Sequence, residues 1–264
     1  MKDAVREQLE ARNSLAEVFH ENTKLGPLTS RAYATWIFNL SRSRAAQQRM
    51  HQGFKTYTLM ERMALPRVEA RTDLERTIAA RRSVRAFSGA AIGVEELARL
   101  LVFTYGPTDP AGVFRAVASG GALYPLELYV AAFKVDGLAE GLYHYGVETG
   151  HLDVVKPGAC LETLKEVVNG QGVDIDNACL AIVITAAFRR STVKYLDRGY
   201  RMVLMEAGEA AQNLCLVAAS LDLGTCLLGG FNDDLLSELL DIDGVEEAPL
   251  LPVIVGRPAA TRAS

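Results

Sequence analysis

The stretch from Tyr200 to Leu221 constrains the fold most, because it has the length of a long helix and is apolar or small on almost every face. A helix of this kind must be covered on all sides, either by the core of its own chain or by another subunit. Four small residues, Ala207, Gly208, Ala210 and Ala211, allow a second backbone to approach closely. We therefore expect this helix to lie at the centre of a homodimer.

Helices and strands alternate from about Arg71 onward. We predict helices from Asp73, as the capping residue, through Arg81, from Val94 to Thr104 and from Asn232 to Leu240. The predicted strands are Leu128–Val135, Leu142–Tyr145, Leu152–Val155, Leu180–Ala186 and Leu250–Val255.

The N-terminal part has a different pattern. Two amphipathic helical segments, Val5–Glu21 and Arg31–Gln52, are separated by a break at Gly26-Pro27. We divide the chain into a helical N-terminal extension, residues 1–65, and one main domain, residues 66–264.

Composition excludes several classes of protein. Of the 264 residues 49% are hydrophobic, which suits a sizeable core, and a net charge of −4 gives no basic field for nucleic acid or an anionic membrane. The longest apolar run, Ala178 to Ala187, is about half of the roughly 20 residues that a membrane span needs. The charged N-terminus does not resemble a signal peptide. We expect a soluble cytoplasmic protein with its four cysteines, Cys160, Cys179, Cys215 and Cys226, reduced.

A cluster of cations closes the first predicted helix of the main domain. Arg81, Arg82, Ser83 and Arg85 place three guanidiniums and a hydroxyl within five residues, which suits the binding of a phosphate. The same cations also suit an ordinary helix C-terminus, where they interact favourably with the helix dipole.

Two glycine pairs are candidate ligand contacts. Ser119-Gly120-Gly121 begins a loop that leads to Pro125 and a strand, and Leu228-Gly229-Gly230 follows a short strand after the long helix. Paired glycines let backbone amides approach a ligand, although each pair also suits a plain turn. No GxGxxG lies between a strand and a helix, so a dinucleotide-binding Rossmann domain is disfavoured. Arg257 ends the last predicted strand.

In order and spacing, these features resemble the FMN-dependent nitroreductase superfamily. Narrower phrases are similar to its SagB-type dehydrogenases, which oxidise peptide azolines to azoles. These phrases are Phe19-His20-Glu21-Asn22-Thr23-Lys24, Ser119 to Pro125 with Leu126-Glu127-Leu128-Tyr129, Gly141-Leu142-Tyr143-His144-Tyr145, and Arg198-Gly199-Tyr200-Arg201.

The resemblance implies an α+β fold with a central, mostly antiparallel sheet flanked by helices, in an interlocked homodimer with FMN at the interface. It implies that Arg81, Arg82, Ser83, Arg85 and Arg257 hold the phosphate and ribityl chain. It also implies that Ser119, Gly120 and Gly121, together with Leu228, Gly229 and Gly230, lie along the isoalloxazine ring.

Lys194 and Tyr195 stand where related azoline oxidases carry a catalytic pair, on a polar loop predicted from Arg189 to Arg198. Aromatising an azoline removes one hydrogen as hydride and one as a proton, so a base is needed. A solvated lysine beside a half-buried tyrosine is the structural alternative. A carboxylate of Asp197, Glu206 or Glu209 is expected to form a structural salt bridge with Arg198 or Arg201. The scattered histidines predict no metal site.

The expected activity is FMN-dependent oxidation of a peptide or carrier-bound thiazoline or oxazoline, with molecular oxygen reoxidising the flavin and a cyclodehydratase or peptide synthetase as a partner. An NAD(P)H-dependent flavin or nitro reductase is one alternative. A flavin-binding scaffold subunit that uses residues 1–65 as a partner surface is the other.

Overall fold

The computed structural model describes residues 14–26, 29–50, 53–168 and 172–260. Its centre is a six-stranded sheet of order β5-β4-β2-β6-β8-β7 in which every neighbouring pair is antiparallel. The strands are β2 (Leu126–Ala132), β4 (Gly141–Gly146), β5 (His151–Pro157), β6 (Leu180–Ala187), β7 (Gly224–Leu227) and β8 (Glu247–Gly256). Two short strands, β1 (Ile92–Gly93) and β3 (Val135–Asp136), pair in parallel beside it. The predicted antiparallel α+β architecture is confirmed.

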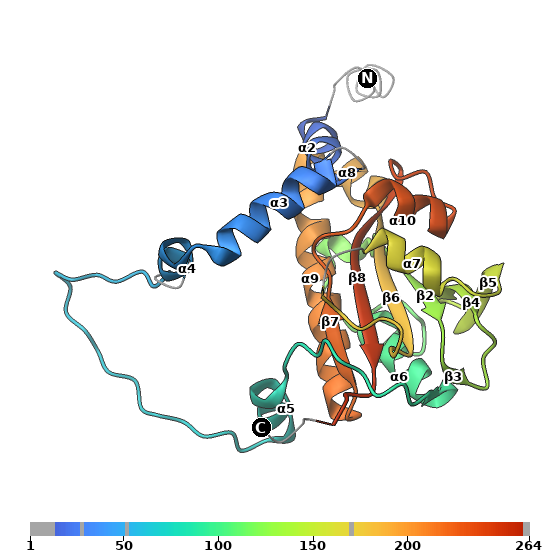
Figure 1. Ribbon diagram of the computed structural model, residues 1–264, viewed down its shortest axis with the longest axis horizontal. Coiled ribbons are helices and arrows are strands. Elements are labelled where there is room, and N and C mark those ends of the chain that lie inside the picture. Colours follow the sequence, from blue (N-terminus) through green and yellow to red (C-terminus); the bar gives the residue numbers. More distant parts are fainter. Residues whose placement is uncertain (1–13, 27–28, 51–52, 169–171, 261–264) are drawn as a thin grey trace.

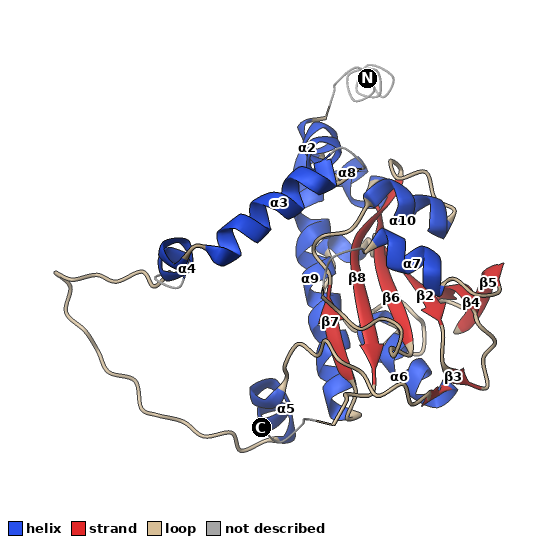
Figure 2. Cartoon of the chain, in the orientation of Figure 1, coloured by secondary structure: helices blue, strands red, loops and turns tan. Residues whose placement is uncertain are grey.

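Helices cover both faces of this sheet (Figure 2). On one face α6 (Val94–Tyr105) and α9 (Asp197–Ser220) pack against alternate strand residues such as Ile182 and Ile184. On the other face α7 (Leu161–Val167) and α10 (Asp233–Leu240) pack against the intervening residues, such as Val183. Because strand side chains alternate between faces, β6 needs apolar residues at every position, as its sequence provides.

The helix before the cation cluster starts one residue earlier than predicted. Thr72, and not Asp73, is the N-cap of α5 (Asp73–Ala80), and it forms a capping box with Glu75. Threonine is the N-cap because its hydroxyl accepts a hydrogen bond from the Glu75 amide. The Glu75 carboxylate in turn accepts a hydrogen bond from the Thr72 amide.

The long helix α9 has two unlike sides. Val203, Ala210 and Leu214 are fully buried against the sheet and α6, whereas Leu204 and Met205 are 40% and 58% exposed. A single chain therefore buries only one side of α9. The apolar sequence of this helix predicts that every side is covered.

The N-terminal part forms α2 (Leu15–Thr23), α3 (Thr29–Arg42) and α4 (Arg44–Met50), while the predicted segment before Ser14 lies outside the described residues. Residues 53–65 were predicted helical and are not. They belong to a non-helical linker, residues 53–71, that runs outside the body of the molecule (Figure 1). Its apolar side chains are not packed: Phe54, Leu59 and Met63 are 87%, 96% and 91% exposed.

Among the helices in the described part of the chain, none is both long and apolar enough to cross a membrane.

Candidate functional site

Lys194 and Tyr195 meet the first glycine pair. A β-carbon at position 121 would lie 2.7 Å from Lys194 Nζ and 2.6 Å from the Tyr195 hydroxyl oxygen, so both polar groups touch the bare backbone of Gly121. Lys194 Nζ also lies 5.1 Å from the centre of the Tyr195 ring. We call Ser119, Gly120, Gly121, Lys194 and Tyr195 the glycine–lysine cluster. All five are residues that the sequence predicts for the site, and the fold brings them together.

The loop beneath this pair has an unusual backbone. Gly121, Ala122 and Tyr124 have φ values of 70°, 53° and 44°. Glycine adopts this region freely, whereas residues with a β-carbon pay about 1 kcal/mol or more and keep it only where the surroundings hold them.

A buried carboxylate holds this loop. Glu206 on α9 is 3% exposed and accepts hydrogen bonds from the Tyr105 hydroxyl at 2.8 Å and the Ser119 hydroxyl at 2.6 Å. Ser119 Oγ in turn accepts the amide of Tyr124 at 2.9 Å. Burial raises the pKa of Glu206. Of the three carboxylates expected to pair with Arg198 or Arg201, Glu206 does not, since its two oxygens bind hydroxyl groups that the sequence does not place nearby.

Lys194 and Tyr195 lie on a helix, α8 (Arg189–Tyr195), and not on the predicted polar loop. Arg190 anchors this helix to the sheet through an ion pair with Glu127 and a hydrogen bond to the Tyr124 carbonyl at 3.3 Å. Glu127 also binds His144 Nε2 at 3.0 Å, which raises the pKa of His144. The anchor fixes where the end of α8 meets Gly121.

The cation cluster lies along the β7 edge of the sheet. Ser83 pairs with Thr225 and Phe87 pairs with Pro258, so residues 83–87 run beside the end of the sheet where β7 starts and β8 finishes. We call Arg81, Arg82, Ser83 and Arg85 the arginine edge. None of its three guanidiniums forms an ion pair with a carboxylate in the part of the chain that the structure describes.

Arg257 differs from these arginines. Its Nη2 binds both carboxylate oxygens of Glu96, at 3.0 and 2.9 Å, and its Nε donates to the carbonyl of Ala91 at 3.1 Å. Glu96 also accepts the amide of Gly93 as a helix cap. In this structure Arg257 therefore stabilises the start of α6. To bind a phosphate, Arg257 would have to release Glu96.

The second glycine pair lies at the far end of β7. Leu228 donates its amide to the carbonyl of Pro252, and Gly229 follows it with an exposed backbone. A β-carbon on Gly229 would meet no atom within 4 Å. A flat ligand can therefore reach this backbone.

The two glycine pairs neighbour different side chains of α9. A β-carbon on Gly120 would meet Met202, while Tyr200 and Gly229 line one cavity. Residues two apart on a helix project about 200° from each other, so Tyr200 and Met202 leave the helix in different directions.

Comparison with known proteins decides the family. The model of the Nitroreductase family matches residues 78–257, well over half of the sequence. The chain belongs to the nitroreductase family. The family predicted from the sequence is confirmed.

Relatives of this nitroreductase-family protein fall into two groups. A putative nitroreductase of Methanocaldococcus jannaschii is 39% identical over 198 residues, which are 73% of this chain and 94% of that protein. The microcin B17-processing protein McbC of Escherichia coli is 28% identical over 62% of each chain. The trifolitoxin-processing protein TfxB of Rhizobium leguminosarum is 25% identical over 63% of this chain and 48% of its own length.

Solved structures agree on the fold. A putative nitroreductase from Anabaena variabilis has a TM-score of 0.63 at 33% identity. The match covers 71% of this chain and 38% of the Anabaena chain. A chain of the E. coli microcin synthetase McbBCD complex with truncated pro-MccB17 bound has a TM-score of 0.68 at 22% identity. That match covers 97% of this chain and 93% of the other.

The chemistry of the arginine edge fits FMN, the cofactor typical of this family. Three guanidiniums without a carboxylate partner suit a phosphate dianion, and the open backbone at Gly229 suits a flat ring. Among the described residues, no group of three or more His, Cys, Asp or Glu side chains is arranged to hold a metal ion.

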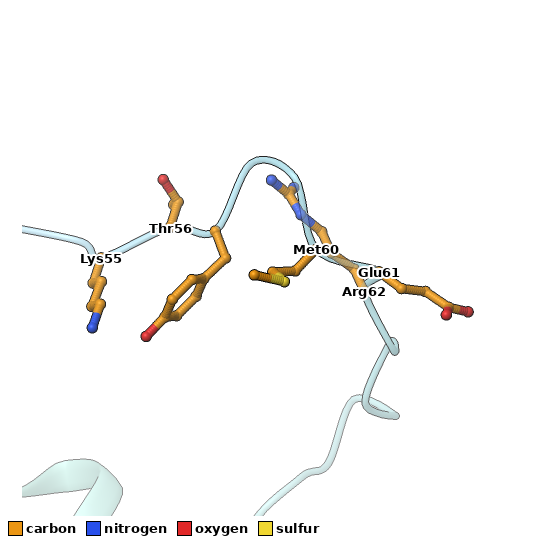
Figure 3. A pocket seen from close by; sticks show the side chains of 6 residues that line it. Lys55, Thr56, Met60, Glu61 and Arg62 are labelled. Carbon is orange, nitrogen blue, oxygen red and sulfur yellow. The ribbon is translucent and has the colours of Figure 1, made fainter.

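A hollow of about 550 Å³ at the linker is separate from the candidate site. It is lined only by Lys55, Thr56, Tyr57, Met60, Glu61 and Arg62 (Figure 3). All of these belong to one bend of residues 53–71, so this hollow has no wall from the sheet or from α9 and is not part of the candidate site.

Proposed function

We propose that this nitroreductase-family protein is an FMN-dependent dehydrogenase that converts a peptide thiazoline or oxazoline to the corresponding azole. The observation that carries the proposal is the convergence of Lys194 Nζ and the Tyr195 hydroxyl on the backbone of Gly121. Two of the relatives are named as peptide-processing proteins, which supports a peptide substrate.

Lys194 and Tyr195 would handle the proton. Oxidising an azoline to an azole removes two hydrogens, one as a proton from carbon and one as hydride. When bound, FMN supplies the hydride acceptor, and molecular oxygen restores the oxidised flavin. Lys194 Nζ would take the proton as the base, with Tyr195 orienting the ring or relaying the proton to solvent.

The arginine edge would bind the FMN phosphate, and Leu228, Gly229 and Gly230 would lie along the ring. Arg257 would join the phosphate contacts by leaving Glu96. Ser119, Gly120 and Gly121 would approach the isoalloxazine from the other side, which requires the glycine–lysine cluster and Gly229 to face one ligand.

That requirement supports a homodimer with shared sites. The α9 side chains that neighbour the two glycine pairs, Met202 and Tyr200, project in different directions, so we infer that one copy would bind the flavin through the arginine edge and the other would offer Lys194. The exposed Leu204 and Met205 on α9 supply apolar surface for such an interface. An enzyme that forms the azoline, a cyclodehydratase or a peptide synthetase, would be the functional partner.

The test is the visible spectrum of the purified protein, followed by mass spectrometry of a model peptide thiazoline incubated with it under air. We expect flavin absorbance and a mass loss of two hydrogens from the peptide. A protein that neither contains nor takes up FMN would refute the proposal. One that binds FMN and oxidises NAD(P)H but leaves the thiazoline unchanged would be a reductase.

A further inference from the structure

Residues 29–71, which we call the arm, consist of α3, α4 and the linker that follows them. The arm lies before the region that the family model matches, residues 78–257. Within its described ranges, 29–50 and 53–71, no side chain is buried. In Figure 1 the arm leaves the body beside α2, runs outward on the side where α9 and the β7 edge lie, and returns to the body at α5. Both ends of the arm are therefore attached to the body, while the side chains between them stay unburied.

The arm is too apolar for an ordinary linker. Twelve of the thirty large apolar side chains that are exposed in the described part of the chain belong to it, although it makes up about a sixth of the sequence. On α3, Tyr33, Trp36 and Ile37 share one face at i, i+3 and i+4 and are 45%, 64% and 47% exposed. Flexible linkers are rich in Gly and Ser, whereas residues 53–71 contain one Gly and no Ser. Exposed apolar surface of this extent indicates contact with another molecule.

The arm is also basic, while the main domain is acidic. The arm contains eight Lys and Arg residues and two Glu residues, a net charge of +6. Residues 72–264 contain 16 Lys and Arg residues and 25 Asp and Glu residues, a net charge of −9. None of the cations of the arm forms an ion pair with a carboxylate of the described residues. These cations are therefore free to face the carboxylates of another molecule.

A second copy of this chain has the surface that such an arm requires. Its main domain supplies the opposite charge, and its helix α9 supplies apolar surface, since Leu204 and Met205 are 40% and 58% exposed. In addition, α9 lies on the side of the body along which the arm runs (Figure 1). Nucleic acid or an anionic membrane would be attracted by the arm but repelled by the acidic main domain beside it. The charges thus favour a second copy over a polyanion.

We propose that the arm of each copy docks on the main domain of the other and closes the homodimer along α9. This inference rests on the homodimer of the proposed function, and it assigns part of the dimer contact to a segment outside the family region. The apolar side chains of the arm supply affinity, and its cations set the orientation against the acidic partner.

Trp36 reports on the arm without a label, because it is the one tryptophan of the sequence. The emission of tryptophan moves to shorter wavelength when its ring leaves water. The experiment follows this emission as the full-length protein is concentrated, with and without FMN, and measures the molar mass by sedimentation velocity. We expect the two to change together, from a monomer with water-exposed Trp36 to a dimer in which Trp36 is shielded.

Two double variants test the apolar and the charged contacts of the arm. Leu59→Ser with Met63→Ser should raise the dimer dissociation constant about 100-fold or more, because burial of each apolar side chain contributes a factor of about ten. Arg62→Glu with Arg67→Glu should raise it about tenfold at low salt and less at high salt, where charges are screened. These side chains are exposed in one chain, so the circular dichroism of the monomer should not change.

The matched controls change residues of the same kinds outside the arm. Val154→Ser alters a side chain that is 61% exposed on β5, at the sheet edge opposite β7. Arg99→Glu reverses an exposed cation on α6. Both controls should dimerise like wild type. Unchanged dimer affinity in both arm variants, or a dimer that forms without a change in the emission of Trp36, would overturn the inference.

Other occupants of the arm give other results, and each would also overturn the inference. A shift of Trp36 emission in a protein that stays monomeric would mean that the arm folds back on its own chain. A shift that appears only when duplex DNA or phosphatidylserine vesicles are added would mean that the arm binds a polyanion.

Turnover separates this inference from the proposed function. Oxidation of the thiazoline peptide by a protein whose dimer does not depend on the arm would reject the docking and keep the dehydrogenase. An arm-dependent dimer that binds no FMN, or that leaves the thiazoline unchanged, would keep the docking and reject the dehydrogenase.

Discussion

The glycine–lysine cluster and the arginine edge differ in what holds their side chains in place. In the glycine–lysine cluster, Ser119 is fixed by buried Glu206, and α8 is tied to the sheet by the ion pair of Arg190 with Glu127. The arginine edge has three guanidiniums without carboxylate partners among the described residues. The difference indicates that protein contacts hold the first region in place, whereas the second carries positive charge that is open to an anionic ligand.

The largest effect is expected from changing Lys194 in the glycine–lysine cluster, which tests whether this region acts in catalysis. Lys194→Ala should lower kcat for thiazoline oxidation about 100-fold or more, the usual contribution of a positioned base, and leave the FMN content unchanged. Steady-state kinetics and the visible spectrum measure both, with Lys165→Ala on α7 as the control. A variant that loses FMN instead would place Lys194 in cofactor binding.

The opposite pattern is expected on the arginine edge. Arg85→Ala should weaken FMN binding about 10- to 100-fold, since a charge-assisted hydrogen bond contributes about 1.5–3 kcal/mol, and kcat at saturating FMN should change little. Fluorescence titration of the FMN-free protein measures the affinity, and Arg99→Ala on α6 is the matched control. Unchanged affinity in Arg85→Ala would argue for a purely structural cluster.

Mixing the two variants tests whether the regions meet across a dimer. If the site is shared, a dimer of one Lys194→Ala chain and one Arg85→Ala chain has one intact site, so unfolding and refolding an equal mixture should restore about a quarter of wild-type activity at limiting FMN. Activity no higher than that of the separate variants would place the whole site within one chain.

Removing Glu206 should loosen the glycine–lysine cluster and lower stability. Glu206→Leu leaves the Tyr105 and Ser119 hydroxyls buried without their acceptor, and we expect a loss of about 2–4 kcal/mol in the free energy of unfolding. Glu206→Gln keeps one acceptor and should lose less. Urea unfolding measures both, and equal stability of Glu206→Leu and wild type would contradict the network.

The smallest expected effect is a pH dependence of the α8 anchor. The pKa of His144 is raised, first by its hydrogen bond to Glu127, so the stability that this contact contributes is complete below about pH 6.5 and is lost as pH rises through the folded-state pKa. Asp153 and Glu247 also face the ring and act in the same direction.

The check is the melting temperature between pH 6 and pH 8.5. It should fall more in wild type than in His144→Gln, which cannot gain the charge. Parallel curves for the two proteins would show that His144 does not contribute.

Periodic patterns predicted most of the fold, whereas contacts between distant residues decided what the sequence missed. The apolar run of β6 and the long apolar helix are evident from local sequence. The helix α8 is not, because Arg189-Arg190-Ser191-Thr192 is polar and the ion pair that ties it to the sheet comes from Glu127, far away in the sequence.

The candidate site shows the same limit. The residues of the glycine–lysine cluster were predicted and lie together, but the partner of Arg257 is Glu96, 161 positions earlier, and that of Glu206 is Tyr105, 101 positions earlier. Spacing within a motif carries no information about such pairs. The hydrogen-bond partner of His20 was likewise not predictable, since Tyr200 lies 180 positions later.

The linker of residues 53–71 makes the docking of α2 on the main domain a first-order step. When extended, the linker spans up to about 60 Å. Because it joins α2 to the main domain, α2 docks in an intramolecular reaction, at a high effective concentration. Proteolytic cleavage of these exposed residues would turn that docking into a second-order association. The contacts of His20 with Phe188 and Tyr200 would then be lost on dilution, while the sheet and α9 stayed intact.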